Sequence, residues 1–104
     1  MRIPLLAGLC LVAASTLCAQ SVPRPARLGL CAACHGATGE ATTPGAPNLA
    51  GQRLDYLRDA LAQYRDGRRD VPVMRTAIGA VSAADLDALA RWYSAQPAAG
   101  QAQP

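Results

Sequence analysis

A single five-residue stretch, Cys31-Ala-Ala-Cys34-His35, constrains this chain more than any other feature. It places two thiols three positions apart and puts the only histidine of the 104-residue chain directly after the second thiol. The rest of the chain has to present this cluster and cover whatever it holds.

Two further cysteines, Cys10 and Cys18, lie in an N-terminal segment with the pattern of a secretory signal peptide. A positively charged start is followed by an apolar run of about 15 residues, shorter than the roughly 20 that a membrane-spanning helix needs. We expect processing near Ala19 and interpret residues 1–19 as the signal, which predicts a periplasmic protein. Membrane contact is then expected only through a partner complex or an uncleaved signal.

The domain left after processing has about 85 residues, a size at which apolar burial alone gives marginal stability. The whole chain contains no Phe, one Trp and three Tyr, so the usual aromatic bulk of a core is missing. A large flat cofactor would supply the missing apolar centre. The net charge of +3 is small and no basic stripe with stacking aromatic residues is present, which excludes nucleic acid as a partner.

Four kinds of chemistry use paired thiols, and they differ in what else they need. A structural zinc site needs about four ligands, more than this cluster offers. A thioredoxin-like dithiol belongs after a strand in a βαβ unit, and a disulfide across two residues closes only a short loop. The C-x-x-C-H order matches covalent haem attachment, in which two thiols add to the haem vinyl groups and His35 binds the iron. We favour haem c, one per chain, over the other three.

The sequence predicts an all-α domain in residues 26–96, after an irregular lead in residues 20–25 and before a disordered tail in residues 97–104. Three principal helices are expected: residues 26–34, a segment from after Gly51 to Gly67, and residues 82–96. The last has the clearest start, because Ser82 can act as its cap and Asp85 can complete a capping box.

Two long connections separate these helices. Residues 37–47 are rich in Gly, Pro and Thr, and residues 68–80 contain Pro72 and Gly79 as breakers, with at most one helical turn near residues 74–78. We expect the cofactor, rather than their own packing, to order both connections. The apolar wall around the cofactor is predicted from helical spacing to be Leu54, Leu57, Tyr64, Leu86, Leu89 and Tyr93.

A haem iron bound by His35 has a second axial position, and Met74 offers the only other sulfur or imidazole of the processed chain. Ligation by Met74 would raise the reduction potential and suit electron transfer. The alternative is that Met74 only fills the core, as most methionines do.

Pro47 is the candidate partner for the other ring nitrogen of His35 through its carbonyl oxygen. Equally, Pro47 can simply shape its loop.

These segments together resemble the short bacterial class I cytochromes c. The resemblance rests on Cys31-Ala-Ala-Cys34-His35-Gly36, Pro47-Asn48-Leu49-Ala50-Gly51-Gln52, Val73-Met74-Arg75, Ser82-Ala-Ala-Asp85-Leu86 and Leu89-Ala90-Arg91-Trp92-Tyr93. It covers about residues 26–96 and implies the cytochrome c fold wrapped around a single haem c. It also implies thioethers at Cys31 and Cys34, His35 and Met74 as axial ligands, Pro47 bonded to His35, and a periplasmic electron carrier.

The chain departs from that family at its first helix. Family members extend this helix by a turn or two and use a glycine to cross closely against an aromatic residue of the last helix, whereas Pro23 and Pro25 shorten it here. Gly29 lies only two residues before Cys31, so this crossing is not expected to form in the usual way.

The second connection carries a group of basic residues, Arg68, Arg69 and Arg75. We interpret them either as a docking site for an acidic partner or as ordinary solvated surface.

The function predicted from the sequence is single-electron transfer between redox partner proteins, with no enzymatic reaction. One alternative is an electron-entry subunit of a larger dehydrogenase or oxidase complex. Another is a haem enzyme or gas sensor with an open sixth position, for which the chain has no second histidine and Glu40 as its lone glutamate.

Overall fold

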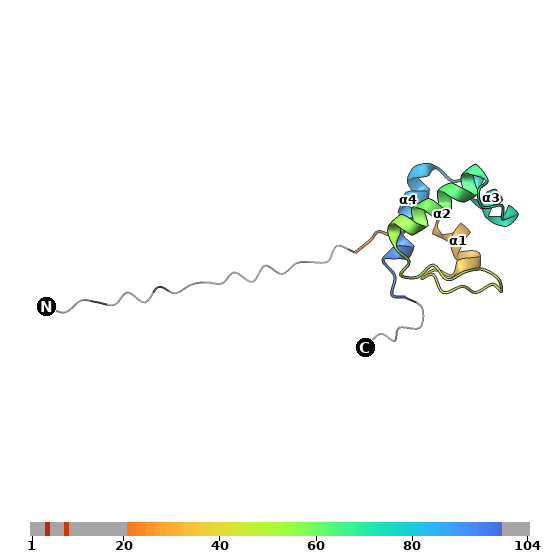
Figure 1. Ribbon diagram of the computed structural model, residues 1–104. Coiled ribbons are helices and arrows are strands. Elements are labelled where there is room, and N and C mark those ends of the chain that lie inside the picture. The colour runs from red at the N-terminus through yellow and green to blue at the C-terminus, as the bar shows by residue number, and fades with distance from the viewer. Residues whose placement is uncertain (1–3, 5–7, 9–20, 99–104) are drawn as a thin grey trace.

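The computed structural model describes residues 4, 8 and 21–98, and all regular structure in this part of the chain is helical (Figure 1). The helices are α1 (Leu28–His35), α2 (Leu54–Asp66), α3 (Pro72–Gly79) and α4 (Ala83–Ser94). The predicted all-α class is confirmed. Apart from residues 4 and 8, the predicted signal peptide lies outside the described residues, as does the predicted tail beyond residue 98.

The segment expected to be a connection with one helical turn contains a complete helix, α3. Pro72 was treated as a breaker, but it occupies the first turn of α3, where a missing N–H has no helical partner to lose. Gly79 is the last residue of the same helix. The two supposed breakers therefore mark the ends of a helix, and the count of three principal helices is wrong by one.

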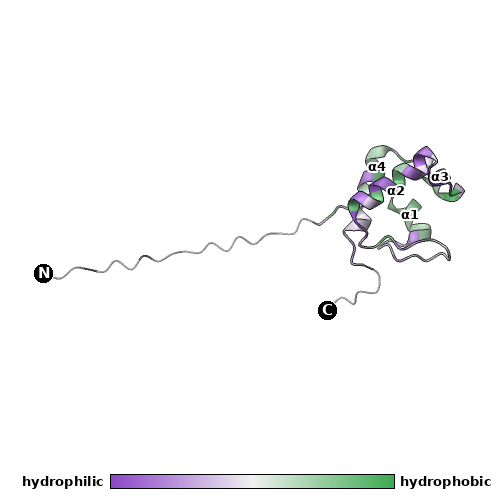
Figure 2. Cartoon of the chain, viewed as in Figure 1, coloured by the Kyte–Doolittle hydropathy of each residue, from purple (hydrophilic) through white to green (hydrophobic). Residues whose placement is uncertain are grey.

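All four helices contribute to one apolar core. Its buried members are Leu28, Leu57, Ile78, Val81, Leu86, Leu89, Ala90 and Tyr93. Figure 1 shows α2 passing between α3 and α4, and it contacts both. Figure 2 shows hydrophilic and hydrophobic residues alternating along α2, as expected for a helix with one face in the core. All six residues of the predicted apolar wall lie in this core or pack against it.

Helix α1 is buried at its first and last residues, Leu28 and His35, and is more open between them. Leu28 is 1% exposed, whereas Leu30 is 41% exposed. A Cβ atom added at Gly29 would meet nothing within 4 Å, so this glycine makes no close helix crossing. The unusual first helix is thus held through Leu28 and the residues of its C-terminal end. Within the described residues, no helix is both long and apolar enough to cross a membrane.

A three-residue ion-pair cluster joins α2 to α4 on the surface. Arg58 contacts both carboxylate oxygens of Asp87, at 2.6 and 3.2 Å, and Arg91 contacts Oδ2 at 2.8 Å. The hydrogen bonds from Arg58 and then from Arg91 lower the pKa of Asp87 from its ordinary value to about 2. The ionised carboxylate of Asp87 therefore stabilises the folded protein.

The depressed pKa of Asp87 predicts an acid-sensitive contribution to stability. Because the folded-state pKa lies below the unfolded value, this contribution is complete above about pH 4 and is lost as the pH falls towards about 2. In urea unfolding, Asp87→Asn should lower the midpoint at pH 7, and its difference from the wild type should shrink below pH 4. Asp70→Asn is the control, since Asp70 is 75% exposed and pairs with Arg75 alone.

Candidate functional site

Helix α1 presents the thiol pair on one side and the histidine at its C-terminal end. Cys31 and Cys34 are both half-buried and are not joined in a disulfide. Burial raises the pKa of the Cys31 thiol, and the positive charge of Arg27 partly offsets this shift. His35 is the last residue of α1 and is 6% exposed. The cluster predicted from the sequence therefore faces the interior, next to the core.

The ring of His35 is fixed by a hydrogen bond to the loop that follows α1. Its Nδ1 lies 2.9 Å from the carbonyl oxygen of Pro47. A carbonyl oxygen can only accept, so Nδ1 is the donor, and in a neutral imidazole Nε2 then keeps its lone pair. Among the described residues, no group forms a hydrogen bond with Nε2. A metal-binding imidazole requires this arrangement. That Pro47 orients His35 as an iron ligand stays a prediction.

The loop between α1 and α2 is held by its own hydrogen bonds. The carbonyl oxygen of Gly39 accepts from the N–H groups of Leu49 and Ala50, at 2.8 and 3.2 Å, and the side chain of Asn48 accepts from the N–H of Ala41. A Cβ atom at Gly39 would lie 2.4 Å from the nitrogen of Ala50, so only glycine permits this closure. The loop therefore has backbone contacts of its own, and the expectation that a cofactor orders it stays a prediction.

Two aromatic residues at the end of α4 hold the backbone directly after His35. The hydroxyl of Tyr93 donates to the carbonyl oxygen of Gly36 at 2.9 Å, and the indole N–H of Trp92 donates to that of Ala37 at 2.7 Å. Burial raises the pKa of Tyr93 to about 12, with a smaller contribution from Cys31. Sequence analysis placed Tyr93 in the apolar wall and missed its polar contact.

Removing the Tyr93 hydroxyl is expected to lower the free energy of unfolding, although the aromatic ring stays in the core. In Tyr93→Phe the carbonyl of Gly36 keeps only the N–H of Gly39, at 3.3 Å. Because one acceptor bond remains, we expect a loss of about 1 kcal/mol in the free energy of unfolding, measured as a lower urea midpoint with unchanged slope. Ser94→Ala, which removes an exposed bond to Arg91, should change the midpoint little. An unchanged midpoint in Tyr93→Phe would contradict the assigned bond.

Met74 lies on α3, not in an irregular segment. It is partly buried and packs against the apolar core, which Cys31 also contacts. The structure therefore groups Cys31, Cys34, His35 and Pro47 around the end of α1, and places Met74 on a different helix at the same core. This arrangement is compatible both with ligation and with simple core filling.

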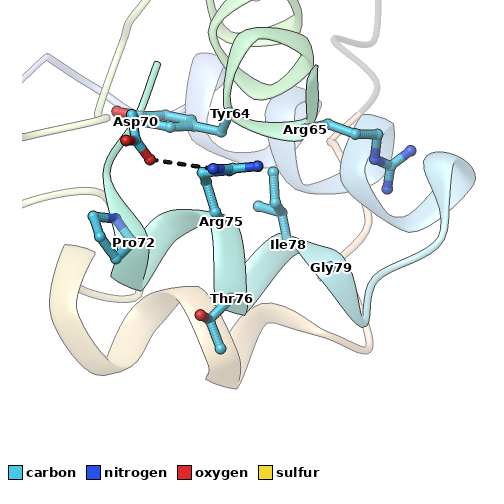
Figure 3. Close-up of a pocket in the computed structure, with 8 residues that line it drawn as sticks. All are labelled: Tyr64, Arg65, Asp70, Pro72, Arg75, Thr76, Ile78 and Gly79. Carbon is cyan, nitrogen blue, oxygen red and sulfur yellow. Dashed lines mark hydrogen bonds and ion pairs between the residues drawn. The ribbon is translucent and has the colours of Figure 1, made fainter. Parts of the chain in front are cut away.

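A groove of about 420 Å³ lies between α2 and α3, and none of the five predicted site residues lines it. Figure 3 shows Arg75 in this groove, bonded to Asp70, with Tyr64 beside them. The lining residues are Tyr64, Arg65, Asp70, Pro72, Arg75, Thr76, Ile78 and Gly79. With Arg75 paired to an acid here and Arg68 paired to Asp66, neither arginine is a free cation.

The donor set fits a covalently bound haem and does not fit zinc. Nowhere in residues 21–98 do three His, Cys, Asp or Glu side chains converge as a metal site. The thiols of Cys31 and Cys34 share a helix face, and the imidazole of His35 has its Nδ1 proton engaged. Glu40, the candidate acid for an enzymatic site, is exposed. Two thiols, one oriented imidazole and an apolar core are what a haem c needs.

Comparison with known proteins points the same way. Residues 28–92 match the model of a family described as cytochrome C oxidase, cbb3-type, subunit III. The chain is 37% identical to cytochrome c-554(548) of Halomonas halodenitrificans over 73 residues, which cover 67% of this chain and 88% of the relative.

Two longer relatives match over a similar stretch. One is cytochrome c4 of Pseudomonas aeruginosa, 36% identical over 80 residues that cover 76% of this chain and 40% of the relative. The other is a thiosulfate dehydrogenase electron acceptor of Thiomonas intermedia, 40% identical over 81 residues that cover 77% of this chain and 37% of the relative. The chain thus aligns with less than half of each of these two proteins.

Proposed function

The chain belongs to the cytochrome c family, and from this premise we propose that it is an exported single-electron carrier whose haem iron is bound by His35 and Met74. Family membership establishes that the protein is a c-type cytochrome with covalently bound haem c and that it takes part in electron transfer. We propose which residues bind the haem, which two bind its iron, and that the protein is exported.

The single observation that carries the assignment is the hydrogen bond between His35 Nδ1 and the carbonyl oxygen of Pro47, at 2.9 Å. It leaves Nε2 of a buried imidazole as an unprotonated donor for a metal, directly beside two free thiols. When bound, the haem supplies an iron that exchanges one electron between its Fe(III) and Fe(II) states.

The protein's residues have three tasks in this proposal. Cys31 and Cys34 would hold the haem covalently, each thiol adding its sulfur and its hydrogen across one vinyl group to give a thioether. His35 and Met74 would hold the iron, and because both would remain its ligands in the two oxidation states, little would rearrange on electron transfer. The core side chains exclude water, which together with the thioether ligand of Met74 tunes the reduction potential.

Spectroelectrochemistry of the protein purified from the periplasmic fraction tests this function. We expect one reversible transition that fits a single electron per chain, and a mature N-terminus close to residue 20. A protein found only in the cytoplasm, or one whose optical change needs two electrons, would contradict the proposal.

A second candidate is a cytochrome subunit of a larger redox complex. The family description names an oxidase subunit, and Leu30 with the open Gly29 leaves part of α1 uncovered. The native mass of the protein in a mild extract distinguishes a free carrier from a subunit of a complex. A free carrier should have the mass of the processed chain plus one haem, and a subunit should have the larger mass of its complex.

A further inference from the structure

The loop between α1 and α2 is attached to the last two residues of α1. The carbonyl oxygen of Cys34 accepts from the backbone N–H groups of Thr42 and Thr43, at 3.0 and 3.3 Å. Further along the loop, the carbonyl oxygen of Pro47 lies 2.9 Å from Nδ1 of His35. The loop therefore leaves the end of α1, is bonded back to it, and then reaches the imidazole.

One side chain joins the two attached parts of the loop. Oδ1 of Asn48, the residue that follows Pro47, accepts from the backbone N–H of Ala41 at 2.8 Å. Ala41 directly precedes Thr42, whose own N–H is bonded to α1. The hydrogen bonds thus form a closed ring that begins and ends at the C-terminal end of α1. In this ring, Asn48 is the link that a substitution can remove without changing the backbone.

The backbone beyond Asn48 is held by other bonds, which act on a different part of the loop. Leu49 and Ala50 donate to the carbonyl oxygen of Gly39. The carbonyl that faces the imidazole belongs to the peptide group between Pro47 and Asn48, and a peptide group can turn about the soft dihedrals on either side of it. Because Asn48 is exposed, its hydrogen bond rather than burial restricts this turn.

We propose that Asn48 is a positioning residue for His35, because its side chain keeps the carbonyl of Pro47 directed at Nδ1. The proposal rests on the proposed function, since it takes His35 as the ligand of the iron. An imidazole whose N–H is held by a well-placed acceptor is a more basic ligand for a metal. Asn48 should therefore strengthen the donation from His35, which favours the oxidised iron and lowers the reduction potential.

The test is Asn48→Ala in the intact holoprotein, read by the rate at which the Nδ1 proton of His35 exchanges with solvent. Nuclear magnetic resonance of the reduced, low-spin protein follows this proton. We expect exchange to become faster by roughly fivefold, the factor that corresponds to losing one ordinary hydrogen bond, and the midpoint potential to rise. Asn48→Asp keeps an oxygen acceptor in the same place and should keep the slow exchange of the wild type.

The matched control is Thr43→Ala, a change in the same loop. Thr43 is exposed, and in the part of the chain that the structure describes its hydroxyl forms no hydrogen bond. The substitution leaves its backbone N–H in place, so the bond to Cys34 is kept. The exchange rate and the midpoint potential of Thr43→Ala should equal those of the wild type.

Unchanged exchange in Asn48→Ala overturns the proposal, even if urea unfolds the variant more easily, because Asn48 would then stabilise the loop without orienting His35. Equal acceleration in Asn48→Ala and Thr43→Ala overturns it as well, since the effect would not belong to the bond with Ala41. Should the proposed function itself fail, the wild type would already lack a low-spin spectrum, which keeps the two failures distinguishable.

Discussion

Replacing Cys31 and Cys34 together with alanine is expected to abolish covalent haem attachment. The two thiols are free and share one face of α1, and no other cysteine lies in residues 21–98. Without them no thioether can form, so denaturing electrophoresis should show no haem on the polypeptide and its mass should equal that of the bare chain. We expect the apoprotein to unfold at a much lower urea concentration, since a small core loses its largest apolar component.

The matched control for this experiment is Ala33→Ser, which changes an exposed position between the two cysteines. It should retain covalent haem and the wild-type mass. Single alanine variants at Cys31 and Cys34 should each keep one thioether at most. If the double variant still carried haem through denaturation, the attachment site would have to lie elsewhere in the chain.

Replacing Met74 with leucine is expected to produce the second large effect. Leucine keeps the apolar volume that packs against the core, but it has no thioether to bind iron. Because axial ligands set haem potentials over a range of about 0.8 V, we expect a fall on the order of 100 mV or more. The ferrous form should also bind carbon monoxide, which the six-coordinate wild type should resist.

Val73→Ala is the control for Met74, because Val73 is the neighbouring residue and is 68% exposed. Its potential should stay close to that of the wild type, and it should not bind carbon monoxide. If Met74→Leu behaved in the same way, Met74 would be a core residue only. The second axial ligand would then be absent or provided by another group.

The haem c cofactor could be predicted from sequence because its attachment motif consists of residues that are close together. The spacing of Cys31 and Cys34 and the position of His35 follow directly from the helix that carries them. The amphipathic patterns of α2 and α4 likewise predicted which side chains enter the core, and Ser82 caps α4 through a bond to the N–H of Asp85, as expected.

The parts that could not be predicted depend on contacts between distant segments. Helix α3 was missed because Pro72 and Gly79 were judged by their usual effect inside a helix, whereas their positions at its two ends make them favourable. The bond between Tyr93 and Gly36 joins residues 57 positions apart. No periodicity contains that information, because it arises only when α4 packs against the end of α1.

The contacts of the neighbouring arginines could not be predicted from the sequence either. From the sequence, Arg68, Arg69 and Arg75 were equivalent members of a basic stretch. The structure separates them, since Arg68 and Arg75 pair with aspartates while Arg69 turns towards Gln63 and two tyrosines. Charge counts alone cannot distinguish an arginine paired with an aspartate from one held by neutral groups.

Optical and electron paramagnetic resonance spectra of the holoprotein in both oxidation states test the central claim most directly. Ligation by His35 and Met74 predicts low-spin iron in both states, together with a sulfur-to-iron charge-transfer band in the oxidised form that disappears in Met74→Leu. A five-coordinate, high-spin ferrous form that binds carbon monoxide readily would contradict the assignment of this protein as a simple electron carrier.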